Sequence, residues 1–249
     1  MISESSKNTC LGELLHENSF IIYKKLEEIA KNELIKFYEE KEKIKLPIDI
    51  RKVIIKNKID IAEMDLNLDM GFRMDKVNGY LRCLENSSST DDSLKWRIYI
   101  DYSDSEFVKR YVLAHEFSHY LLKKYSGEMS RLAEDSCIDP MFPKKKKELV
   151  AETLSAYFLL PPDALLNAMI DYRNEMKKSN QYPVDSVLFL QKIGNRAQIS
   201  TYHTIICYQY VRYYFCSLYE QKIREAESDR HEDKQNALKW LEEYGDFFK

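Results

Sequence analysis

The sequence predicts an α+β fold, in which a small three-stranded sheet packs on helices and a helical region follows towards the C-terminus. Three observations lead to this prediction. The segment 59–64 alternates apolar and polar residues with the two-residue period of a strand, and 79–83 and 96–101 are two further strand candidates. A run of helical period follows directly after the third segment. Further helical stretches, separated by prolines and polar breaks, continue beyond residue 146. Strands followed by a series of helices are typical of the α+β class.

Length and composition agree with a largely helical protein. The chain has 249 residues, enough for one large domain or two small ones. We expect an N-terminal helical segment over 1–45, a core over 46–165 and a helical C-terminal region over 166–249. The formal net charge of −3 argues against a general nucleic-acid binder, because such a protein would carry a basic excess.

The first elements follow from local signals. Residues 13–45 have apolar positions at helical spacing, and Pro47 ends this run. A short helix is expected over 49–57. The strand at 59–64 comes next, and the polar stretch 85–92 joins the second strand to the third.

The helix after the third strand carries an HExxH sequence. Ser103 and Glu106 have the spacing of a capping box, which marks a helix start. On a helix, His115 and His119 lie one turn apart on one face, so two imidazoles can bind a single Zn²⁺. Glu116 then lies beside the metal, where its carboxylate can take a proton from water. The alternative is a chance match with two core histidines. Each buried imidazole would then need its own hydrogen-bond partner.

A third metal ligand is predicted on a second helix, over residues 147–160, which Pro161 and Pro162 end. Catalytic zinc sites usually have three protein ligands and one open position for water. Glu148 and Glu152 are four residues apart and share one helix face, where two like charges are unfavourable without a cation opposite. The spacing leaves open which of them binds the metal, or whether both are exposed side chains.

These segments together resemble the ImmA/IrrE-type zinc metallopeptidases, from about residue 45 to residue 162. The resemblance is carried by Leu46–Ile50, Asn78–Leu81, Trp96–Asp101, Arg110–Glu116 and Leu154–Pro161. It implies a zincin-like core of gluzincin-like geometry, in which His115, His119 and Glu148 bind Zn²⁺ and Glu116 is the general base. Glu152 falls where the family usually has Asn. A polar side chain there can orient a ligand histidine, and Glu152 is also the alternative third ligand.

The resemblance implies an endopeptidase that cleaves a specific regulatory protein, such as a transcriptional repressor of a mobile genetic element or of a stress response. The alternative is a non-proteolytic regulatory or sensor protein. In that case the zinc core is a scaffold, and the C-terminal helices bind DNA or a protein partner. A metal with a water position reachable from a cleft favours the peptidase, whereas a buried four-ligand site favours the scaffold.

The C-terminal region is expected to be helical and to dock a partner. Asp163 and Asp185 can cap its first two helices. Residues 193–202 resemble a helix-turn-helix with Ser200 as the cap of the second helix. An ordinary helical hairpin is the favoured interpretation, so DNA binding is not favoured. Aromatic residues in this region are typical of a core or of a partner-facing surface. They are Tyr202, Tyr208, Tyr210, Tyr213, Tyr214, Phe215, Trp240, Tyr244, Phe247 and Phe248.

Cysteine usage and hydropathy predict a cytoplasmic protein that does not bind a membrane. The five cysteines form no CxxC pair, which is typical of reduced thiols in a cytosolic chain. The N-terminal stretch is polar and has no visible signal peptide, and no apolar run approaches the length needed to cross a bilayer.

Overall fold

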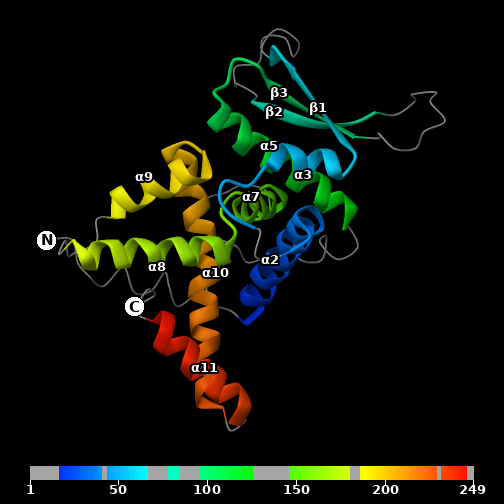
Figure 1. The fold of residues 1–249 in the computed structure, drawn as a ribbon. Coiled ribbons are helices and arrows are strands. Elements are labelled where there is room, and N and C mark those ends of the chain that lie inside the picture. The colour runs from blue at the N-terminus through cyan, green and yellow to red at the C-terminus, as the bar shows by residue number, and fades with distance from the viewer. Residues whose placement is uncertain are drawn as a thin grey trace, which may run out of the picture.

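The computed structural model describes residues 17–40, 44–66, 78–84, 96–125, 146–179, 186–228 and 231–245. Its helices are α2 (Glu17–Tyr38), α3 (Ile50–Lys56), α5 (Glu106–Lys124), α7 (Lys146–Leu159), α8 (Pro162–Lys178), α9 (Ser186–Ala197), α10 (Thr201–Glu227) and α11 (His231–Tyr244), and its strands are β1 (Ile59–Met64), β2 (Gly79–Cys83) and β3 (Trp96–Asp101). The predicted α+β fold class is confirmed (Figure 1). The predicted linker at 85–92, Asp185, Phe247 and Phe248 lie outside the described residues, and the three-part domain division stays a prediction.

The sheet is mixed and has the strand order β1-β3-β2. The central strand β3 pairs in parallel with β1 and antiparallel with β2, so that Ile98 lies opposite both Ile61 and Leu81. In the part of the chain that the structure describes, β2 is therefore an edge strand. The three strands have the bounds predicted from the sequence.

Helix α5 packs between the sheet and α7. At Gly79, a Cβ atom would lie 2.3 Å from Val112 Cγ1 on α5 and 3.0 Å from the carbonyl oxygen of Tyr99. The first distance is shorter than Cβ contacts essentially ever are and the second is tight, so glycine at this position allows β2 to lie against α5. This close approach brings the edge strand beside the helix that carries the HExxH sequence.

The start of α5 differs from the prediction. The capping residue is Ser105, whose side chain accepts a hydrogen bond from the backbone N–H of Val108. Ser103 does not cap the helix, because its backbone N–H and its hydroxyl both donate to the Asp101 carboxylate, over 2.8 and 2.6 Å. Ser103, the cap that the capping-box spacing predicts, is thus part of a local turn at the end of β3.

Helix α7 lies at the centre of the molecule, where it contacts α5, α2 and α10 (Figure 1). Every residue from Leu149 to Pro162 is buried. A helix enclosed on all sides is expected to be largely apolar, and Glu152, Thr153 and Ser155 are the polar residues among its buried ones. The next helix, α8, begins at Pro162 with Pro161 as its N-cap and without a side-chain cap, so the prediction that Asp163 caps it is wrong. Proline suits this position, because its fixed φ angle and missing N–H cost nothing in a first helical turn.

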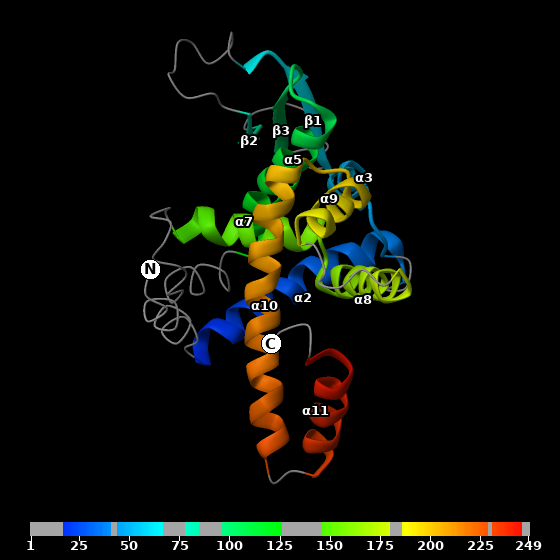
Figure 2. The ribbon, with the colours of Figure 1, turned by 90° about the vertical axis from the view of Figure 1, so that its left-hand side faces the viewer.

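Helix α10 begins beside α5 and runs away from the sheet to α11, which lies at the opposite end of the molecule (Figures 1 and 2). Ser200 caps it, as predicted, and accepts a hydrogen bond from the backbone N–H of His203. Tyr210 and Phe215 are buried against the core, whereas Tyr202 is 70% exposed. Among the described residues, no single helix is both long and apolar enough to cross a bilayer, and only α7 and α8 taken together across a 54° bend meet that criterion.

Candidate metal centre and its cleft

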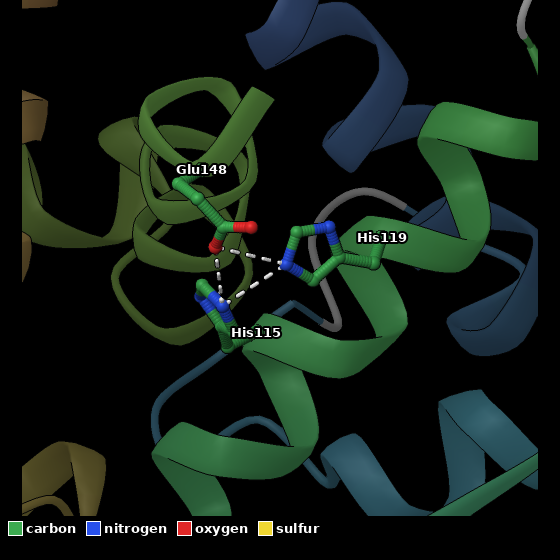
Figure 3. A group of neighbouring side chains, drawn as sticks. All are labelled: His115, His119 and Glu148. Atoms are coloured by element: carbon green, nitrogen blue, oxygen red, sulfur yellow. Dashed lines mark hydrogen bonds and ion pairs between the residues drawn. The ribbon is translucent and has the colours of Figure 1, made fainter. Parts of the chain in front are cut away.

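Three side chains from two helices converge on one point. His115 and His119 project from α5, and Glu148 reaches them from the first turn of α7 (Figure 3). The two Nε2 atoms are 3.1 Å apart, and Glu148 Oε2 lies 3.4 Å from that of His115 and 3.3 Å from that of His119. The side chains are 19%, 23% and 45% exposed, so the group is partly shielded yet open to solvent.

These distances fit a tetrahedral metal ion. Ligand atoms at about 2.0–2.1 Å from a tetrahedral zinc lie about 3.3 Å from one another, close to the three separations found here. Two imidazoles and one carboxylate form a ligand set typical of zinc peptidases. Within the described residues, His115, His119 and Glu148 are the group of His, Cys, Asp and Glu side chains whose donor atoms come together in this way. Three protein donors leave a fourth position for water or substrate.

Glu116 lies next to this group in a more enclosed setting. Its side chain is buried, and its carboxylate accepts a hydrogen bond from the backbone N–H of Leu81 on β2. In the absence of a metal, burial and the nearby charge of Glu148 raise the pKa of Glu116 to about 7, against the lowering effect of the Leu81 hydrogen bond. A carboxyl group whose pKa is near neutrality can accept a proton and release it again.

Glu152, one turn after Glu148 on α7, does not join the three donors. It is 8% exposed, and Tyr210 on α10 donates a hydrogen bond to its Oε2 over 2.5 Å. Glu148 is thus the glutamate that approaches both histidines, and Glu152 points towards α10. The roles of both residues stay predictions.

A cleft of about 780 Å³ opens beside the candidate metal centre. His115, Glu116 and Glu152 contribute to its wall, and the ring of Tyr111 stacks on His203 at 4.0 Å and on His115 at 6.3 Å. The edge strand and α10 complete the lining. The other lining residues are Asn78, Gly79, Val112, Tyr202, Ile205, Ile206, Gln209, Tyr210 and Tyr213.

Residues 59–201, from β1 to the start of α10, match the model of the Peptidase M78 family, the IrrE N-terminal-like domain. The chain belongs to this family. Membership confirms the predicted family resemblance and supports a peptidase activity. No curated protein matches the sequence. His203 and Tyr210 line the cleft but lie just beyond the region that matches the family.

Sequence reasoning proposed all three members of the donor group but missed much of what surrounds them. It did not find the Tyr210 contact with Glu152, the Tyr111 stack or the Leu81 hydrogen bond to Glu116. Only the aromatic enrichment of residues 202–215 signalled that α10 had a packing role. Nothing in the spacing along the chain indicates that α10 borders the metal centre.

Proposed function

We propose that the protein is a zinc-dependent endopeptidase that cleaves a specific intracellular regulatory protein, such as a transcriptional repressor of a mobile element or of a stress response. The observation that carries this proposal is the convergence of His115, His119 and Glu148 at 3.1–3.4 Å, with buried Glu116 beside them in an open cleft. Membership of a peptidase family supports the reaction class.

In this proposal, His115, His119 and Glu148 hold the ion and Glu116 moves the proton. A zinc ion there would lower the pKa of water towards neutrality and polarise the carbonyl of a peptide bond. Glu116 takes the proton that water loses as its oxygen bonds to the carbonyl carbon. It then gives that proton to the amide nitrogen as the C–N bond breaks. The products are an amine and a carboxylic acid, and the acid releases the second proton of the former water as it ionises to a carboxylate. The Leu81 N–H orients the Glu116 carboxylate for both steps.

The cleft provides room for a polypeptide segment beside the donors. One of its walls is the edge strand β2, and an extended peptide can add to such an edge through backbone hydrogen bonds. This supports a protein substrate in preference to a small molecule. The non-proteolytic scaffold is less well supported, because the described donors number three and His115 faces an open cleft.

The test is co-expression of the full-length protein with regulatory proteins encoded beside its gene. We expect cleavage of one of them by the wild type and none by Glu116→Gln. The matched control is Glu106→Gln, at an exposed position in the first turn of the same helix, which should cleave like the wild type. A zinc-loaded wild type that cleaves none of these proteins, and no other protein of the cell, would favour the scaffold.

A further inference from the structure

The ring of His115 packs against two other aromatic rings of α5. Tyr111, one turn earlier, lies nearly parallel to it, with ring centroids 6.3 Å apart and an interplanar angle of 19°. His119, one turn later, meets it edge-on at 4.7 Å. The helix backbone places the Cβ atom of His115 but does not fix the rotation of its ring, because the χ2 angle of histidine has broad preferences. The neighbouring rings therefore limit the plane in which its Nε2 atom approaches a metal ion.

Tyr111 is itself stacked by a ring from another helix. The imidazole of His203, in the first turn of α10, lies 4.0 Å from the Tyr111 ring at an interplanar angle of 18°. The χ2 angle of tyrosine is as broad as that of histidine, so Tyr111 alone does not provide a fixed plane. A parallel ring at this distance restricts its rotation. His203 thus sets the plane of the ring that borders His115.

Ser200 holds His203 in place. Its Oγ atom lies 2.8 Å from His203 Nδ1 and also accepts a hydrogen bond from the His203 backbone N–H over 3.3 Å. Both contacts belong to the N-terminal cap of α10, where the backbone is fixed by the start of the helix. A continuous series of contacts therefore joins the cap of α10 to a metal donor on α5, through His203 and Tyr111.

We propose that His203 is a positioning residue for the metal centre. Its ring holds Tyr111 in a plane that limits rotation of the His115 imidazole, so that Nε2 is oriented before a metal ion binds. This inference rests on the proposed function, which assigns His115 as a metal ligand. Side chains that orient a ligand histidine usually do so through a hydrogen bond, whereas the contact here is aromatic.

The test measures metal binding by the full-length protein. Competition with a chelator gives the affinity for Zn²⁺, and the visible absorption of bound Co²⁺ reports the ligand geometry. His203→Asn removes the ring but still offers a polar group to Ser200. We expect its zinc affinity to fall about two- to tenfold, the range of one aromatic pair, and its Co²⁺ spectrum to change. His203→Phe keeps a ring and should have the wild-type affinity and spectrum.

A second variant tests whether the two rings act in series. Zinc affinity should fall in Tyr111→Leu, and the addition of His203→Asn should lower it no further, because the effect of His203 passes through Tyr111. The matched control is Tyr208→Leu. Tyr208 is also half-buried on α10, but its ring meets Phe189 on α9, edge-on at 6.0 Å. This control removes an aromatic contact of the same helix and should keep the wild-type zinc affinity and Co²⁺ spectrum.

Each contrary result is distinct. An unchanged affinity and spectrum in His203→Asn overturn the inference but leave the metal site intact, and so do equal losses in His203→Asn and His203→Phe. A loss of the same size in Tyr208→Leu would reduce the effect to general destabilisation. If the wild type binds neither Zn²⁺ nor Co²⁺, the proposed metallopeptidase site itself is wrong. If His203→Asn does not fold, Tyr111→Leu decides, since an unchanged affinity there excludes any effect through this ring.

Discussion

The proposed function assigns metal binding and proton transfer to different residues. His115, His119 and Glu148 present donor atoms to one point, whereas Glu116 is buried beside them and is held by Leu81. The two tasks are therefore separable by mutation.

Glu116→Gln should keep the metal and lose cleavage. Glutamine has nearly the same shape but cannot take a proton from water, so we expect cleavage to slow by about 10²–10⁴-fold, the range of general base catalysis. Elemental analysis should still find one zinc per chain. Cleavage of the partner protein at the wild-type rate would rule out Glu116 as the base.

Glu148→Ala should weaken zinc binding more than Glu152→Ala. The Glu148 carboxylate lies 3.3–3.4 Å from both histidine nitrogens, whereas Glu152 contacts Tyr210. Loss of a residue that only orients a ligand typically costs about 10–100-fold in metal affinity, and loss of a ligand should cost more. Competition with a chelator measures both affinities. The opposite order would make Glu152 the third ligand.

The sequence predicts those parts of the candidate site that depend on residues a few positions apart along one helix. The i, i+4 relation brings His115 and His119 together on any helix, and the second helix supplies two glutamates in register. The choice between these two was not available from spacing, because it depends on the packing of α7 against α5. The Tyr210 contact with Glu152 spans 58 residues and leaves no local signal.

At the scale of secondary structure elements, the position of β2 against α5 determines one wall of the cleft. Gly79→Ala tests this contact, because the added methyl group would meet Val112 and the Tyr99 carbonyl. Overpacking of this kind costs about 1–3 kcal/mol, which urea unfolding measures. The displaced strand should also lower cleavage, since the Leu81 N–H moves away from Glu116. An unchanged free energy of unfolding would show that β2 does not lie this close to α5.

Glu33 on α2 joins that helix to the end of α5. It is 1% exposed and accepts hydrogen bonds from Tyr125, Lys36 and Lys124 at 2.6, 2.9 and 3.2 Å. Burial alone would raise the pKa of Glu33, but the hydrogen bonds from Tyr125 and Lys36 and the charge of Lys124 outweigh it, so the pKa lies below its usual value.

Glu33→Gln should therefore destabilise the fold by about 1–3 kcal/mol near neutral pH. A pKa that is lower in the folded state than in the unfolded state contributes stability above about pH 4.3, and the contribution is lost as the pH falls through the folded value. The difference in free energy of unfolding between the wild type and Glu33→Gln should shrink from about pH 6 towards about pH 3. A difference that does not change with pH would contradict a charged Glu33 in this contact.

The elements show where sequence prediction ends. The bounds predicted for the three strands are those of the structure, because a short run of residues is enough to mark a strand. Such a run does not predict that β3 is central or that β1 runs parallel to it, since pairing depends on contacts distant in sequence. The cap of α5 is Ser105 and not the predicted Ser103 for a comparable reason. Ser103 donates hydrogen bonds to the Asp101 carboxylate at the end of the preceding strand.

For the whole molecule, the C-terminal region has two distinct parts. The first half of α10 covers α7 and lines the cleft, through Glu152–Tyr210 and through Tyr157–Tyr214, whose ring centroids are 6.0 Å apart. Its second half extends away from the sheet and packs with α11 (Figure 2). The candidate active site therefore depends on α10, although the family match ends at residue 201.

Two truncations separate these parts. A chain that ends after Ser228 loses α11 but keeps both α10 contacts with α7, so it should retain one zinc per chain and lose only about 2–8 °C in Tm, the effect of about 1–2 kcal/mol. A chain that ends after Lys178 loses α10, which exposes fully buried Tyr157 and removes the hydrogen bond from Tyr210 to Glu152. Because metal binding and folding are coupled, this chain should bind zinc weakly and melt without a cooperative transition. Full zinc affinity in the shorter chain would mean that the metal site folds independently of the helix that forms one wall of its cleft, and would contradict this prediction.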